Sequence, residues 1–229
     1  MTEIAMYIDI EGFAQKFNNG ARQSFIDLTN DLFTLGQKYF KHLAIYQFGG
    51  DGFLIKEFLT YSKDVVKFVD LATALLQSIV IRGGMGRVQI SFGNMPDISG
   101  LYSADVQAQL RKEKLNLLAE YQNIMLVSPI IGTSIINCYK LSGPSGPMLL
   151  IDKQLVNEDI NLPLVHHNEN GYDVFAVNWL NYSNQNTNDI LNVLALDNKT
   201  LLKNYKNYIE SNELKEEWKI QAMSLIKEV

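Results

Sequence analysis

Two aspartates beside glycines, Asp9 and Asp51, are the residues best suited to chemistry in this sequence. Asp9 ends an alternating apolar run that continues into Glu11-Gly12-Phe13, and Asp51 lies in a Gly-Gly-Asp-Gly turn between two β-like runs. If the two strands pair, the carboxylates meet at one end of a sheet, and at about 4 Å they repel by roughly 4 kcal/mol. Such a pair requires a shared proton or a cation. Hard oxygen ligands suit Mg²⁺ or Mn²⁺ together with substrate phosphates, so the pair predicts a divalent-metal site.

Either motif alone has a purely structural explanation. Asp-Gly is common in hairpin turns, and an aspartate at a strand end often caps the following helix. The two motifs together, 42 residues apart (51 − 9) with a helix-length segment between them, favour function. The Gly12-Phe13 turn between a strand and a helix adds backbone N–H groups that are suited to phosphate oxygens.

The composition limits the class of protein. The 229 residues are 47% hydrophobic and 20% charged, as in a globular domain, and the net charge of −5 with scattered Lys and Arg argues against a nucleic-acid partner. The apolar runs are too short to cross a bilayer, and residues 1–10 carry no basic flank typical of a signal peptide. The single cysteine, Cys138, suits a cytoplasmic location and is expected in the core.

Hydrophobic periodicity predicts the order of the elements. The first are a strand ending near residue 10, a helix that follows Gly20, a hairpin over 43–48 and 53–58, a helix that begins at Ser62, and a strand-like run over 79–92 that contains Arg82-Gly83-Gly84-Met85-Gly86. Later elements are expected at 103–121 (helix), 132–141 (helix), 148–152 (strand), 164–167 with 172–179 (hairpin), 200–209 (helix) and 213–226 (helix).

This order is β-α-β-β-α-β followed by additions, which is the ferredoxin-like pattern. We therefore expect an α+β fold with a mostly antiparallel sheet and two helices on one face. A second copy of the chain would cover the other face. The Asn- and Ser-rich composition after Asn181 predicts a linker, and hence a catalytic domain over 1–182 and a C-terminal helical extension over 183–229.

The motifs resemble those of the class III nucleotidyl cyclases. That family has a Phe-x-Asp-Ile-x-Gly-Phe strand, matched at 7–13, and a Gly-Asp-Gly hairpin, matched at 50–52. Residues 82–86 are similar to its Arg-x-Gly-Ile strand, and 132–141 with 146–152 are similar to a later helix and strand. The resemblance covers about residues 3–180.

The resemblance implies roles for individual residues. Asp9, Asp51 and the Ile10 carbonyl would bind two Mn²⁺ or Mg²⁺ ions. The Gly12 and Phe13 amides would hold the triphosphate of a nucleoside triphosphate. The metals would then aim the ribose 3′-OH at the α-phosphorus.

The departures from the family pattern concern the base and the transition state. Gln47 stands where adenylate-specific members have a lysine, and Pro129 replaces a second base-reading residue. The transition-state asparagine falls on Ile136, one step from Asn137, and the family arginine falls on Lys140. In the expected base site, Gln47 has the donor and the acceptor to read the edge of a uracil or cytosine, and Tyr46 supplies an aromatic face.

These features are similar to those of the pyrimidine cyclases of bacterial anti-phage (Pycsar) systems. The resemblance implies a homodimer with active sites at the interface that converts UTP, or as the second choice CTP, to the 3′,5′-cyclic nucleotide and pyrophosphate. The product would activate a separate effector in antiviral defence. Whether Lys140 acts across the dimer stays open.

Two alternatives remain. Gly-Gly-Asp-Gly-Phe nearly spells the signature of diguanylate cyclases, although Gly52 replaces its glutamate. A catalytically dead cyclase fold that only binds a nucleotide or dimerises would explain the altered asparagine and arginine positions. The presence of both Asp9 and Asp51 argues against a catalytically dead protein, because such a protein does not need a metal site made of two carboxylates.

Overall fold

The computed structural model describes residues 3–12, 19–38, 43–48, 52–58, 62–94, 96, 98–113, 117–120, 123–126, 131–141, 146–158, 160–169 and 172–227. Within these ranges the main sheet has the order β2-β3-β1-β4-β7-β9-β8. Its strands are β1 (Glu3–Ile10), β2 (Ala44–Phe48), β3 (Gly52–Phe58), β4 (Gly86–Gly93), β7 (Leu149–Asp152), β8 (Leu164–Glu169) and β9 (Tyr172–Val177). The β4–β7 pair is parallel and the other pairs are antiparallel. The predicted α+β fold with a mostly antiparallel sheet is confirmed.

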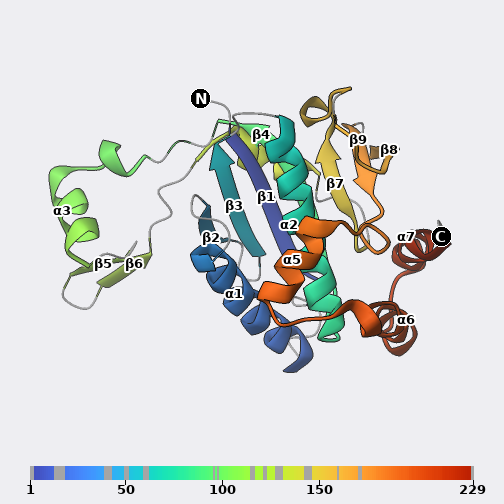
Figure 1. Ribbon diagram of the computed structural model, residues 1–229. Helices are drawn as coiled ribbons and strands as arrows, with labels where there is room; N and C mark the ends of the chain where they lie inside the picture. The colour runs from blue at the N-terminus through green and yellow to red at the C-terminus, as the bar shows by residue number, and fades with distance from the viewer. Residues whose placement is uncertain are drawn as a thin grey trace.

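The first four strands and two helices form the predicted ferredoxin-like unit. Helix α1 (Asn19–Lys38) connects β1 to β2, and α2 (Ser62–Ile81) connects β3 to β4. Both lie in front of the sheet in Figure 1. Alternation along β1 directs Ile4, Met6, Ile8 and Ile10 into the core beneath these helices, because successive strand residues face opposite sides.

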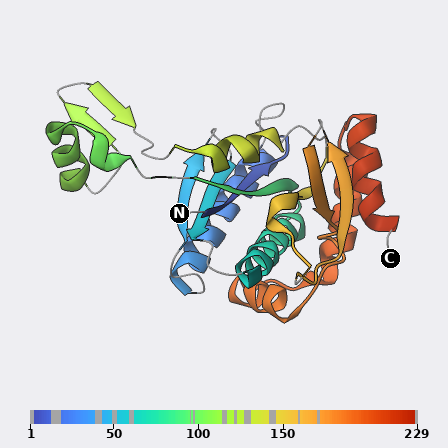
Figure 2. The ribbon, with the colours of Figure 1, turned by 90° about the horizontal axis from the view of Figure 1, so that it is seen from above.

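The opposite face of the sheet carries a smaller helix. Helix α4 (Thr133–Lys140) lies across the sheet from α2 in Figure 2. A separate apolar cluster forms there from Ala5, Tyr7, Leu54, Ile135 and Cys138. We call this side of the sheet the Tyr7 face. Because α4 packs on β1 and β4, it limits the area that a second subunit has to cover.

The prediction that residues 82–86 lie inside a strand is wrong. Helix α2 continues to Ile81, and Gly83 N–H donates to the Val80 carbonyl while Gly84 N–H donates to the Ile79 carbonyl. These two bonds and the φ of 88° at Gly83 form a Schellman motif, which ends a helix with a left-handed glycine. The glycines are therefore a helix cap, and β4 begins only at Gly86.

The predicted helix over 103–121 is correct only in its first half. Helix α3 spans Ala104–Glu113, and a two-stranded sheet follows, formed by β5 (Leu117–Glu120) and β6 (Asn123–Leu126). The two strands pair antiparallel, with Leu117 opposite Leu126 in the register. α3, β5 and β6 lie apart from the main sheet in both ribbon views (Figures 1 and 2).

The expected linker after Asn181 contains a helix, α5 (Gln185–Val193), whose first turn is capped by the Asn184 side chain. The two predicted C-terminal helices are present as α6 (Leu201–Ser211) and α7 (Glu216–Lys227). Short 3₁₀ turns lie at Ser99–Leu101, Lys153–Leu155 and Asn198–Thr200.

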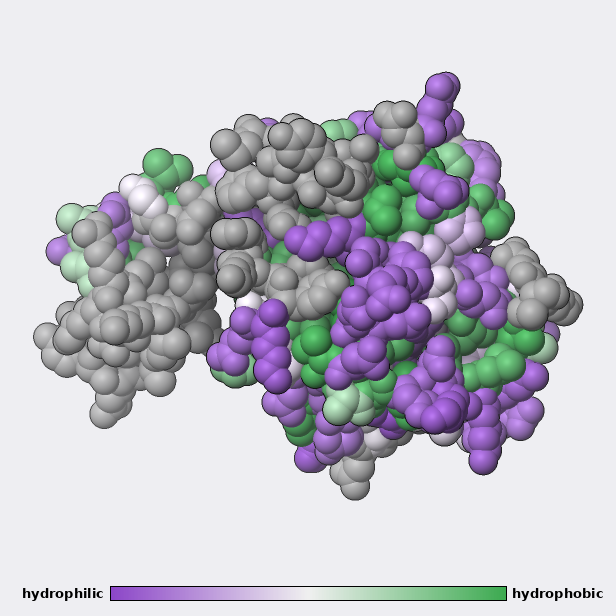
Figure 3. Space-filling view, in the orientation of Figure 1, coloured by the Kyte–Doolittle hydropathy of each residue, from purple (hydrophilic) through white to green (hydrophobic). Residues whose placement is uncertain are grey.

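The C-terminal helices share the main core. Ile190, Tyr205 and Ala222 are fully buried in the same cluster as β1 and α2. On the face in Figure 3, hydrophilic and apolar side chains alternate over these helices. The division of the chain at 182/183 stays a prediction.

None of the helices in the described part of the chain combines the length and the apolarity that crossing a bilayer requires.

Because the thiol of Cys138 is buried, we expect the folded protein to become less stable at alkaline pH. Burial raises the pKa of its thiol to about 12, against an ordinary value of 9.0. At pH values between these two pKa values, the thiol is ionised in the unfolded chain but protonated in the folded one. The free energy of unfolding therefore falls as pH rises, by up to about 1.4 kcal/mol per pH unit. We expect the urea midpoint to fall as the pH rises from 9.0 toward about 12, and to fall less in Cys138→Ala. An equal fall in both proteins would contradict this cause.

Candidate functional site

Asp9 lies at the end of β1, where the sheet brings the two aspartate motifs together. Its Cα is opposite Gly52 of β3 on one side and Arg87 of β4 on the other. Asp51 lies outside the described residues, but Gly52 is the next residue in the chain. The pairing of the first strand with the Gly-Asp-Gly hairpin, on which the predicted metal site depends, is therefore present in the structure.

Arg87 is a site residue that the sequence reasoning missed. Its Nε and Nη2 donate to Asp9 Oδ2 at 3.1 and 2.8 Å, and its Nε lies 3.9 Å from Glu11 Oε1. Burial disfavours the charged guanidinium, but the carboxylates of Asp9 and Glu11 outweigh burial and raise the pKa of Arg87 above its ordinary value. The permanent charge of Arg87 therefore neutralises part of a strongly acidic strand end.

The described strand end supplies only part of a ligand set for a hard divalent cation. The Asp9 side chain is 13% exposed, and its Oδ1 accepts no hydrogen bond from the residues that the structure describes. Glu11 adds a second carboxylate near Arg87. The described ranges contain no cluster of three or more His, Cys, Asp and Glu side chains. A complete ligand set would therefore have to include Asp51, which stays a prediction, as does the role of the Ile10 carbonyl.

The turn after β1 has a backbone conformation that requires glycine. Gly12 adopts a φ of 82°, a left-handed conformation that favours glycine. The Glu11 amide donates to the Met85 carbonyl at 3.0 Å, which fixes one side of the turn. Phe13 lies outside the described residues, so its contribution stays a prediction.

Gly52 is required by the close approach of an aromatic ring. A Cβ at this position would lie 2.6 Å from ring atoms of Tyr7. Tyr7 in turn stacks on Tyr139 of α4, with ring centroids 5.5 Å apart. The glycine after Asp51 therefore allows Tyr7 to lie across the hairpin strand and links the hairpin, β1 and α4 on one face.

The structure separates the two residues predicted to read the base. Tyr46 pairs with Leu54 and packs on the cluster of the Tyr7 face. Gln47 pairs with Phe53, whose ring stacks on Phe25 of α1 on the other side of the sheet. By strand alternation, Tyr46 thus lies on the face of Asp9, and Gln47 lies on the opposite one.

Helix α4 carries the two residues predicted to act in the transition state. The Asn137 side chain donates to the Phe92 carbonyl of β4 at 3.2 Å, which anchors α4 to the sheet. Lys140 is exposed in the last helical turn. Both residues lie on the helix that covers the Tyr7 face, while Ile136 is 54% exposed and points away from the sheet. Their catalytic roles stay predictions.

The ferredoxin-like sheet, with Asp9 at the end of its first strand and opposite Gly52, has the fold of solved nucleotidyl cyclase structures. The chain is similar to the crystal structure of the adenylyl cyclase CyaB from P. aeruginosa, with a TM-score of 0.55 and 14% identity over 81% of this chain and 96% of that one. It is also similar to the guanylyl cyclase Cya2, with a TM-score of 0.50 and 11% identity over 77% and 91% of the two chains. No protein-family model matches the sequence, and no curated protein matches it. At these identities the likeness establishes the fold.

Proposed function

We propose that the protein is a nucleotidyl cyclase that converts UTP, with CTP as the second choice, to a 3′,5′-cyclic nucleotide and pyrophosphate. The observation that carries the proposal is the position of Asp9, directly opposite the residue that follows Asp51. Two carboxylates at one strand end suit a divalent-metal site. The fold shared with CyaB and Cya2 supports the same reaction class.

The chain contributes positioning and charge. Bound Mn²⁺ or Mg²⁺, two ions per site, would lower the pKa of the ribose 3′-OH and neutralise the pyrophosphate. Asp9 and Asp51 would hold the ions, with the Ile10 carbonyl as a further ligand, and the Gly12 amide would donate to the triphosphate. The Arg87 guanidinium stands beside Asp9 and adds positive charge where the triphosphate has to lie.

The proposed preference for a pyrimidine base depends on which side chains lie on the Tyr7 face. Position 47 carries no lysine to read adenine, and its glutamine lies on the other side of the sheet. Tyr46 remains as an aromatic surface on the face of Asp9. An aromatic ring can stack on any base, so we assign the pyrimidine preference to the absence of adenine contacts together with Tyr46.

The site is completed by a second copy of the chain. Ile131, Ile136 and Tyr139, at or near α4, are 53%, 54% and 44% exposed, which is apolar area suited to a homodimer interface. In such a dimer Lys140 would supply the charge that the family arginine supplies, as a point charge rather than a fork. The cyclic nucleotide would act on a separate effector in antiviral defence.

The test is a product assay with each of the four nucleoside triphosphates and Mn²⁺. Cyclic UMP, or cyclic CMP, made by the wild type and lost in Asp51→Ala supports the proposal. Cyclic AMP or cyclic GMP as the main product overturns the base preference. A dinucleotide from GTP identifies a diguanylate cyclase instead, and nucleotide binding without any product identifies a catalytically dead module.

A further inference from the structure

A cavity of about 150 Å³ lies behind the turn that follows β1. Its wall comes from four segments: the β1–α1 turn, the first turns of α1, the cap between α2 and β4, and the inner side of α6. Gly12 lines it from the first segment, and Tyr208 and Asn212 line it from the last. A residue close to the end of the chain thus reaches the backbone predicted to bind the triphosphate.

Tyr208 approaches Gly12 with its hydroxyl. The distance from the Tyr208 oxygen to the position of a Cβ on Gly12 is 3.7 Å. The side chain is half-buried, and burial with the nearby charge of Glu11 raises the pKa of its phenol to about 12. The hydroxyl therefore stays neutral and protonated at physiological pH.

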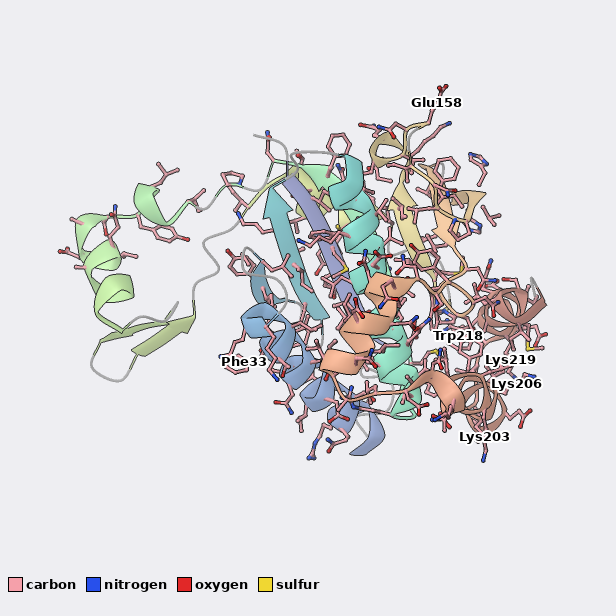
Figure 4. The ribbon with its side chains drawn as sticks, in the orientation of Figure 1. Phe33, Glu158, Lys203, Lys206, Trp218 and Lys219 are labelled. Atoms are coloured by element: carbon pink, nitrogen blue, oxygen red, sulfur yellow. The ribbon has the colours of Figure 1, made fainter. Side chains whose placement is uncertain are left out.

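Helix α6 is fixed tightly enough to hold this hydroxyl in place. Asn204 donates to the Ile81 carbonyl at the end of α2 at 2.8 Å, so α6 is tied to the cap that borders the cavity. The Tyr208 ring lies 6.1 Å from the ring of buried Trp218. Figure 4 shows Trp218 on the inner side of α7, whereas Lys203 and Lys206 extend from the outer side of α6.

We propose that Tyr208 is a positioning residue for the β1–α1 turn, so that α6 and α7 belong to the active site. The turn is held on one side by the bond from Glu11 to Met85. The cavity lies on the other side of the turn and leaves the turn room to shift. The side chain of Tyr208, from α6, limits this shift. The consequence for catalysis rests on the proposed function, whereas the contact itself does not.

The test compares Tyr208→Phe and Tyr208→Ala with Tyr205→Phe as a matched control. Tyr205 lies one turn earlier on α6, and its hydroxyl donates to the Ala222 carbonyl at 2.9 Å, away from the cavity. Tyr208→Phe removes the hydroxyl that lies 3.7 Å from the Cβ position of Gly12 and keeps the ring against Trp218, so we expect the fold to be retained. The readouts are hydrogen exchange of the Gly12 amide, KM for the nucleotide, kcat, and the urea midpoint.

We expect Tyr208→Phe to speed exchange at Gly12 and to raise KM by about threefold to tenfold, with little change in kcat, and Tyr208→Ala to do more. Tyr205→Phe should lower the urea midpoint without changing exchange at Gly12 or KM. Wild-type exchange and KM in both Tyr208 variants would overturn the inference, and so would an equal rise in KM in Tyr205→Phe. If the wild type makes no product, the proposed function fails, and exchange at Gly12 still decides this contact.

Discussion

Replacing Asp9 by asparagine is expected to lower the rate of cyclisation by at least about a thousandfold, which corresponds to roughly 4 kcal/mol of transition-state stabilisation. The amide keeps the shape of the side chain and removes the negative charge that would hold the metal. It also removes the ion pair with Arg87. Turnover with saturating Mn²⁺ and UTP measures the loss, and circular dichroism checks that the fold is retained.

Asp152→Asn is the matched control for this experiment. Asp152 also ends a strand of the same sheet, but it accepts from the Ser91 hydroxyl and from the Gln154 amide. Its substitution should change stability and leave kcat within about twofold, because it lies in β7, two strands from β1. Equal losses in the two variants would show that the Asp9 effect comes from folding, and unchanged turnover in Asp9→Asn would contradict the metal-site assignment.

Replacing Asp70 by alanine is expected to lower the free energy of unfolding by about 3 kcal/mol. This carboxylate of α2 is fully buried and accepts from the Tyr182 hydroxyl at 2.7 Å and from the side-chain amides of Asn184 and Asn186 at 2.7 and 2.9 Å. Burial, together with Asp70, raises the pKa of Tyr182, so the phenol remains a donor. Alanine leaves three donors without their acceptor. Urea unfolding measures the change.

Asp189→Ala is the control for Asp70. Asp189 accepts one hydrogen bond, from Gln185 at 2.8 Å, within α5 at the surface. We expect a change below about 0.5 kcal/mol for this substitution. Hydrogen exchange of α5 should rise in Asp70→Ala, because Tyr182, Asn184 and Asn186 lose their hydrogen bonds to α2. A similar small effect for both aspartates would show that the buried carboxylate does not anchor the C-terminal segment.

The elements with regular hydrophobic periodicity were predictable. Alternation along β1 and the apolar stripe of α2 are local patterns, and the structure places both as expected. The end of α2 was not predictable, because two glycines are compatible with a strand bulge and with a helix cap. In the structure the Arg82 amide donates to the Ser78 carbonyl and its guanidinium pairs with buried Asp31 of α1, a contact between two helices that the local sequence does not indicate.

Helix α5 was not predicted for a similar reason. Its Asn- and Ser-rich start has the composition of a linker, and order there depends on a partner 114 residues earlier, where Asn184 meets Asp70. Arg87 was missed because the predicted strand-like run over 79–92 contains it but does not indicate which residue of the first strand it faces. The register of the β1–β4 pair places Arg87 opposite Asp9. This register depends on how the two strands pair, and the sequence of either strand alone does not determine it.

The candidate site was predictable only where it depends on strand pairing. The opposition of Asp9 and the hairpin follows from two β-like runs and a helix between them. The register of the β2–β3 hairpin decides on which face of the sheet Gln47 lies. The residue types in the turn do not determine this register. The distance of α4 from the strand end is set by tertiary packing, including the stacking of Tyr139 on Tyr7.

The most direct measurement is a crystal structure with Mn²⁺ and a non-hydrolysable UTP analogue, with the ion located by its anomalous signal. We expect an ion within about 2.1 Å of an Asp9 carboxylate oxygen, shared with residue 51, and the guanidinium of Arg87 turned from Asp9 toward the phosphates. A nucleotide bound with Arg87 still on Asp9 and no ion at the end of β1 would contradict it.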